Sequence, residues 1–119
     1  LSLTLGGGEV KPIELAGAYT AFANGGHKTD PIAILKVTDP KGKVLSEQKD
    51  VSKKRVLSSE IAYIISHMLL DNNARLLTFG VNSYLNLGGK TIAVKTVTTV
   101  DKRYNWTIGL CATRTVGIC

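Results

Sequence analysis

Two places in this sequence set a serine at a spacing from a basic side chain that nucleophilic catalysis could use. Ser46 precedes Lys49 by three residues, but both lie in a polar run after a predicted hairpin arm. A lysine that accepts a serine proton must be desolvated at the start of a helix, so this spacing is a chance match. Ser66 and His67 are neighbours on a predicted helix, where successive side chains point about 100° apart. They cannot hydrogen-bond as nucleophile and base, so we expect no serine nucleophile in this chain.

Other combinations that could bind a cofactor or a metal are also incomplete. Gly89-Lys90-Thr91 matches the end of a phosphate-binding loop, but Tyr84 stands where that loop requires glycine, and a predicted strand follows instead of a helix. Cys111 and Cys119 form neither a disulfide framework nor a CxxC metal pair, and packed or surface thiols are the simpler interpretation. The sequence therefore predicts no metal site and no cofactor.

The net charge of +6 among 119 residues is spread along the chain. Its one cluster comprises Lys49, Lys53, Lys54 and Arg55, without an aromatic side chain that could stack on a base. We interpret this cluster as part of a solvated loop and predict no nucleic-acid partner. No apolar run approaches the roughly 20 residues of a membrane span, and the start at Leu1 lacks both Met and a charged leader region. The sequence is expected to begin within a longer protein.

Two segments carry apolar residues at helical spacing. A helix is predicted over residues 12–23, because Pro12 suits a first turn and Asn24-Gly25-Gly26 supplies left-handed residues that end a helix. Its apolar residues extend around more than one face, so we expect it to be covered nearly all round. A second helix is predicted over residues 59–70, with Ser58 as N-cap. Its apolar residues keep i, i+3, i+4, i+7 and i+8 spacing; they are Ile61, Ile64, Ile65, Met68 and Leu69.

Turn signals and alternating residues predict the strands. Residues 32–47 are expected to form a hairpin around Asp39-Pro40-Lys41-Gly42-Lys43, followed by a polar loop to Arg55. Residues 74–79 could add one or two helical turns before Gly80. Three further strands are predicted over residues 91–99, 105–111 and 115–119. This order indicates an α+β domain with a mostly antiparallel sheet and packed helices.

Three stretches together resemble the transpeptidase domain of class A penicillin-binding proteins, the bifunctional peptidoglycan synthases of bacteria. They are residues 1–26, with Gly6-Gly7-Gly8 before the first helix; Val56-Leu57-Ser58 with the second helix; and residues 89–99, continuing through 101–109 with Asn105-Trp106-Thr107. The resemblance covers almost the whole chain. It implies a partial penicillin-binding/serine β-lactamase-like transpeptidase fold, with residues 1–119 as a C-terminal fragment of one such domain.

The resemblance also implies roles for the run Lys95-Thr96-Val97-Thr98-Thr99. The family combines a serine nucleophile, a lysine three residues later, a Ser-x-Asn motif and a Lys-Thr-Gly strand, and only the last has a counterpart here. Carried over, Lys95 would hold the carboxylate of the peptide substrate, with Thr96 and Thr98 beside it. Strict alternation would put Lys95 and Val97 on one face of the strand and Thr96 and Thr98 on the other. The nucleophile is expected upstream of Leu1.

Position 97 departs from the family pattern, which has Gly where this chain has Val97. Glycine lets a strand approach a neighbouring segment or a bound acyl group closely, so Val97 is expected to weaken acylation. Further departures from the family pattern lie at Leu110-Cys111-Ala112 and at Cys119. A further interpretation is therefore that this segment has been altered or engineered.

The function implied is that of a partial D,D-transpeptidase of peptidoglycan cross-linking, inactive alone, at the extracytoplasmic face of the bacterial inner membrane. The intact domain would bind a peptidoglycan stem peptide or a β-lactam. The alternative is a non-catalytic module that binds peptidoglycan peptides or a protein partner. Because the first helix is apolar on several sides, we expect the remainder of the transpeptidase domain, or self-association, to cover it.

Overall fold

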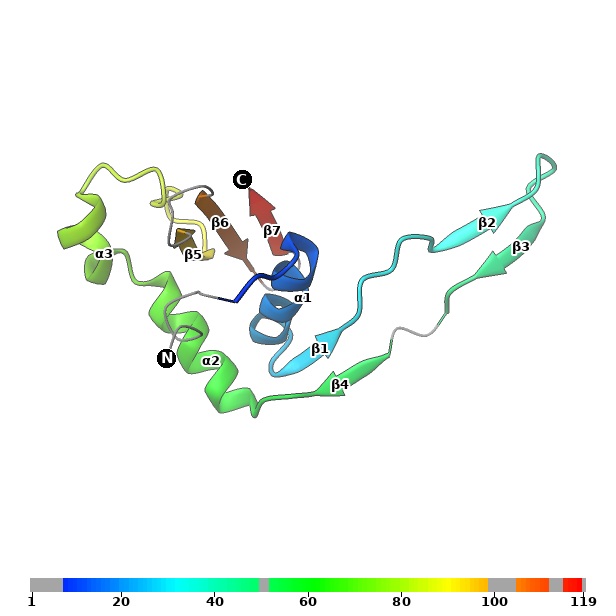
Figure 1. Cartoon of the computed structure of the whole chain (residues 1–119), viewed down its shortest axis with the longest axis horizontal. Coiled ribbons are helices and arrows are strands. Elements are labelled where there is room, and N and C mark those ends of the chain that lie inside the picture. Colours follow the sequence, from blue (N-terminus) through cyan, green and yellow to red (C-terminus); the bar gives the residue numbers. More distant parts are fainter. Residues whose placement is uncertain (1–7, 50–51, 99–104, 112–114, 119) are drawn as a thin grey trace.

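The computed structural model describes residues 8–49, 52–98, 105–111 and 115–118. It contains helices and antiparallel strands in separate runs along the chain, which confirms the α+β class (Figure 1). The elements in chain order are α1 (Pro12–Ala23), β1 (His27–Thr29), β2 (Lys36–Thr38), β3 (Val44–Glu47), β4 (Lys53–Arg55), α2 (Ser59–Leu70), α3 (Asn72–Phe79), β5 (Ala93–Thr98), β6 (Asn105–Leu110) and β7 (Thr115–Ile118). The predicted strand ends at Thr99 and Cys119 lie outside the described residues.

The body of the molecule is an antiparallel sheet in the order β5-β6-β7, on which α1 and α2 pack. Helix α1 contacts β6 and β7, and α2 contacts β5 and α1. The core is small. Among the described residues, the buried apolar side chains are Ala21, Ala62, Ala93, Val94, Ile108 and Leu110. None of the described helices has the length and hydrophobicity that a membrane span requires.

Helix α1 ends where the sequence predicts, because the chain needs glycine there. Gly25 and Gly26 have φ values of 59° and 92°, in the left-handed region that glycine favours. A side chain at Gly26 would also meet the Leu57 carbonyl oxygen at 2.1 Å. The carbonyl of Gly26 accepts hydrogen bonds from the backbone N–H groups of Val56 and Leu57. This close contact joins the end of α1 to the start of α2.

Helix α2 begins as predicted, and only part of its apolar stripe is covered. The Ser58 hydroxyl accepts a 3.3 Å hydrogen bond from the Ile61 backbone N–H, as an N-cap should. Ile61, Ile64 and Met68 are 48%, 50% and 67% exposed, whereas Ile65 and Leu69 are half-buried and Ala62 is buried. Small residues on the Ala62 side let α2 approach α1 closely, and the Ser66 hydroxyl donates a 3.5 Å hydrogen bond to a carbonyl of α1.

A two-stranded arm projects away from the helices and the sheet (Figure 1). Its outer part is the predicted hairpin, with β2 and β3 around a turn in which the Asp39 carboxylate accepts hydrogen bonds from the backbone N–H groups of Lys41 and Lys43. The segment predicted as a polar loop up to Arg55 instead contains β4, which pairs with β1. This pairing joins segments far apart in the sequence. Three consecutive basic residues have no local pattern that predicts a strand.

Helix α3 starts two residues earlier than the predicted turns at 74–79. The Asp71 carboxylate accepts hydrogen bonds of 2.9 and 3.3 Å from the backbone N–H groups of Asn73 and Ala74. Asp71 therefore ends α2 and caps α3, which explains why the polar Asp71-Asn72-Asn73 run does not interrupt helical structure for long. The loop after α3 leads to β5, which carries the residues of the candidate site.

Candidate functional site

Strand β5 lies at an edge of the sheet, because it pairs with β6 alone among the described residues. The antiparallel register sets Lys95 opposite Ile108, and Thr96 opposite Thr107. Lys95 is exposed and Thr96 is half-buried. The candidate lysine thus stands on a strand whose outer side has no described partner strand, where an extended chain could approach.

The register confirms how the side chains of β5 alternate. Cross-strand partners share a face, so Lys95 and Val97 lie on the face of Trp106 and Ile108. Thr96 and Thr98 lie on the opposite face. The three residues predicted to bind substrate are therefore neighbours along one strand, but their side chains do not converge on one face.

Two backbone carbonyls at the outer edge of β5 accept hydrogen bonds from basic side chains. Arg75 donates a 3.3 Å hydrogen bond from Nη1 to the Val94 carbonyl, and the Lys95 ammonium donates to the Thr96 carbonyl. Carbonyls of alternate residues point to the same side of a strand, so those of Val94 and Thr96 both point outward. The Lys95 ammonium is thereby drawn towards the edge next to Thr96, although its side chain starts on the other face.

Arg75 is a site residue that no sequence pattern singles out, and its guanidinium is partly buried beside β5. Its Nη2 donates to the Asn72 side-chain oxygen at 2.7 Å and to the Leu70 carbonyl at 3.4 Å. Its Nε is buried without a hydrogen-bond partner in the part of the chain that the structure describes. A single arginine on a short helix gives no recognisable pattern, and the contact with Val94 spans 19 positions, so sequence reasoning had no signal to use.

Val97 lies directly opposite Trp106, and both side chains are half-buried. Pairs of an aromatic and a β-branched residue at such positions stabilise a sheet by roughly 0.2–1 kcal/mol relative to alanines. Position 97 thus has a packing role that glycine would not fill.

A family model described as the penicillin-binding protein transpeptidase domain matches residues 1–115. This chain belongs to the penicillin-binding protein transpeptidase family. The resemblance found in the sequence is thereby confirmed.

Relatives of this transpeptidase-family chain occur in several bacteria. It is 38% identical over 92 residues to penicillin-binding protein 2D of Bacillus subtilis, covering 77% of this chain and 13% of that protein. It is 31% identical over 113 residues to penicillin-binding protein 1A of Neisseria flavescens, covering 92% of this chain and 14% of that protein. Penicillin-binding protein 1A of Clostridium acetobutylicum is 35% identical over 96 residues, covering 81% of this chain and 11% of that protein. The chain thus spans a small part of the length of these relatives.

The rejected nucleophiles of this penicillin-binding protein chain have other contacts in the structure. Ser46 lies on the projecting arm, opposite Val37, far along the chain from β5. The Ser66 hydroxyl donates to the Phe22 carbonyl, and the His67 ring lies 5.8 Å from the ring of Tyr63. Neither serine forms a hydrogen-bonded pair with a basic side chain among the described residues.

A cavity of about 290 Å³ lies between α1, α2 and the end of β5 that precedes Lys95. Its walls are mainly apolar and include Phe22, Tyr63, Leu70, Ala93, Leu110 and Cys111. Cys111 is half-buried, which agrees with the interpretation of a packed thiol, whereas Cys119 lies outside the described residues. The polar lining of the cavity consists of the hydroxyl-bearing residues Ser59, Tyr63, Ser66 and Thr91, without a lysine or arginine to pair with a peptide carboxylate.

Proposed function

We propose that this chain supplies the substrate-binding edge of a peptidoglycan D,D-transpeptidase, with Lys95, Thr96 and Thr98 as the residues that hold the peptide. The observation that carries the proposal is the position of Lys95, exposed on an edge strand in a chain that the family model matches almost throughout. The fold we propose is a partial penicillin-binding/serine β-lactamase-like transpeptidase fold, as a C-terminal portion of one domain.

The chemistry of β5 suits a peptide that ends in a carboxylate. An extended peptide can add to an exposed strand edge through backbone hydrogen bonds. The Lys95 ammonium would then attract the terminal carboxylate of a stem peptide or of a β-lactam. The exposed Thr98 hydroxyl would donate a hydrogen bond from the neighbouring face.

Acylation requires a serine nucleophile activated by a base, and neither Ser46 nor Ser66 is hydrogen-bonded to a basic side chain in the part of the chain that the structure describes. We therefore propose that the chain is inactive alone and works together with the remainder of the transpeptidase domain. The site of action would be the extracytoplasmic face of the bacterial inner membrane, where peptidoglycan is cross-linked.

The exposed apolar face of α2 supports this partnership. Ile61, Tyr63, Ile64 and Met68 are each at least 48% exposed on a single helix. Contiguous apolar side chains on a surface typically mark a contact with another protein segment. We propose that the remainder of the transpeptidase domain covers this face, and that copies of the isolated chain associate through it.

A second candidate function is a non-catalytic module that binds peptidoglycan peptides or a protein. The pairing of Val97 with Trp106 favours it, because the position that is glycine in the family here stabilises the sheet instead. The two candidates differ in whether Lys95 matters for peptide binding.

Calorimetric titration with a peptide ending in D-Ala-D-Ala tests the proposal. We expect Lys95→Ala to weaken binding about tenfold, as loss of a charged hydrogen bond should, and Lys90→Ala, a nearby exposed lysine, to leave it unchanged. Equal affinity of the wild type and Lys95→Ala would favour the second candidate. Covalent labelling of the isolated chain by a fluorescent β-lactam would contradict the absence of a nucleophile.

A further inference from the structure

The projecting arm concentrates the positive charge of the molecule. Residues 27–55 contain eight lysines and arginines and four acidic residues, so they carry +4 of the net +6. The sequence distributes these residues over a long segment, but pairing of β1 with β4 gathers His27, Lys28, Lys53, Lys54 and Arg55 at the base of the arm. We call these two strands, His27–Thr29 and Lys53–Arg55, the basic ribbon.

Like charges face each other across the basic ribbon. Lys28 lies directly opposite Lys54, with Lys53 and Arg55 next to Lys54 on β4. Like charges at directly opposed positions of an antiparallel pair destabilise it. A bound anion would remove this repulsion, so the register itself favours a negatively charged ligand.

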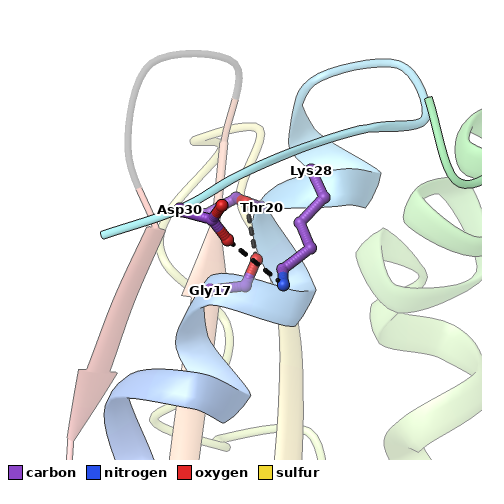
Figure 2. A network of polar contacts seen from close by, with 4 residues as sticks. All are labelled: Gly17, Thr20, Lys28 and Asp30. Atoms are coloured by element: carbon purple, nitrogen blue, oxygen red, sulfur yellow. Dashed lines mark hydrogen bonds and ion pairs between the residues drawn. The ribbon is translucent and has the colours of Figure 1, made fainter. Parts of the chain in front are cut away.

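The charges of the basic ribbon are only partly compensated within the chain. Lys28 forms a 3.3 Å ion pair with Asp30 beside α1, next to the hydrogen bond from Thr20 to Gly17 (Figure 2). In residues 8–49, 52–98, 105–111 and 115–118, no ion pair involves Lys53 or Lys54. All three residues of β4 are exposed. The ribbon therefore presents unneutralised ammonium groups to solvent.

We propose that the basic ribbon is a docking surface for the carboxylates of stem peptides on a peptidoglycan strand, separate from the Lys95 edge. Lysines are flexible point charges, which suit a multivalent and mobile anion better than one tightly held group. The ribbon has no aromatic residue for base stacking, which disfavours a single-stranded nucleic acid. The choice of peptidoglycan rests on the proposed function, whose substrate polymer carries many carboxylates.

The arm extends away from β5 (Figure 1). A strand held at the ribbon would therefore present another of its stem peptides to Lys95, and linked binding events of this kind raise overall affinity. The ribbon would hold the polymer near the chain, whereas recognition of one peptide end would belong to the Lys95 edge.

Sedimentation with purified, uncrosslinked peptidoglycan tests the inference with two variants of equal net charge. We expect Lys28→Gln/Lys54→Gln to reduce the bound fraction about fivefold to tenfold, from the loss of two exposed ion pairs. Lys41→Gln/Lys43→Gln, at the tip of the arm, should bind as the wild type does. Amidation of the polymer's carboxylates should abolish binding by the wild type. Equal losses in the two variants would show that net charge alone acts, and would overturn the assignment to the ribbon.

Three further measurements separate the possible causes of lost binding. Lys28→Gln/Lys54→Gln removes both a like-charge pair and the exposed Lys28–Asp30 ion pair. These small effects oppose each other, so its melting temperature should stay close to that of the wild type, and unfolding cannot then explain lost binding. Polyphosphate and phosphatidylglycerol vesicles serve as competing anions; binding of either one, with none to peptidoglycan, would overturn the proposed partner. Titration of the same variant with the soluble D-Ala-D-Ala peptide should be unchanged, which separates failure of the ribbon from failure of the Lys95 site.

Discussion

The Arg75 guanidinium donates a 3.3 Å hydrogen bond to the carbonyl of Val94, the residue immediately before Lys95. The same guanidinium bonds the Leu70 carbonyl and the Asn72 side chain. One side chain therefore connects the end of α2, the start of α3 and the outer edge of β5. This arrangement makes Arg75 a positioning residue for the strand that carries Lys95.

Arg75→Met should lower the free energy of unfolding by about 1–3 kcal/mol, because charged hydrogen bonds to three acceptors are lost. Urea denaturation measures this change. Hydrogen exchange of the β5 amides should accelerate, whereas exchange in β7, which lies beyond β6, should change less. Arg75→Lys keeps the charge but not the planar fork, so an intermediate effect is expected. Unaltered protection of β5 in Arg75→Met would contradict the positioning role.

Val97→Gly should have opposite effects on stability and acylation. The loss of the contact with Trp106 and the added backbone freedom should cost roughly 1 kcal/mol of unfolding free energy. In a complete transpeptidase domain that carries this segment, labelling by a fluorescent β-lactam should accelerate, because the backbone can approach the acyl group. Val97→Ala, which keeps a small side chain, serves as the control. If labelling by the glycine variant did not rise, the steric account of position 97 would be wrong.

Gly26→Ala should destabilise the chain by more than about 2 kcal/mol, since it combines a left-handed backbone with a steric clash. Its Cβ would meet the Leu57 carbonyl at 2.1 Å, whereas a Cβ at Gly25 would meet nothing within 4 Å. Gly25→Ala, with only the backbone penalty, should cost about 1 kcal/mol. Thermal denaturation of both variants distinguishes the two contributions, and equal losses would exclude the clash.

Replacing apolar residues on the exposed face of α2 should reduce self-association. Ile64→Ser/Met68→Ser removes two side chains that are 50% and 67% exposed, so the fold should be retained. Sedimentation velocity should then show a shift from associated species to monomer. The control is Leu77→Ser, at an exposed position on α3. A wild-type chain that sediments as a compact monomer would contradict the proposed covering of this face.

Acid should destabilise the start of α2 through Glu60. The hydrogen bond with its own backbone lowers the pKa of Glu60, and the hydroxyls of Ser58 and Ser59 lower it further. A carboxyl with a lowered folded-state pKa contributes stability above its unfolded pKa, and this contribution is lost as pH falls through the folded value. Glu60→Gln should therefore flatten the acid limb of a melting-temperature profile below the ordinary glutamate pKa. An identical profile in the wild type and the variant would contradict this account.

Local rules in the sequence determined several features of this protein. The bounds of α1 follow from Pro12 and the two glycines after Asn24, and the start of α2 follows from the Ser58 cap. The alternation of Lys95 and Thr96 follows from strand geometry alone. These features depend on interactions within a few positions. The family resemblance also came from the sequence alone, through three stretches that together cover almost the whole chain.

Only the tertiary structure decided which apolar face of α2 is buried, where the basic residues gather and what holds β5. Helical spacing offers two apolar stripes on α2, and the small side chain of Ala62, not the larger Ile61, fits against the body of the molecule. Pairing of Lys28 with Lys54 and the bond from Arg75 to Val94 join residues 26 and 19 positions apart. Such contacts depend on how the helices and strands pack together in the folded chain, and local periodicity in the sequence does not determine that packing.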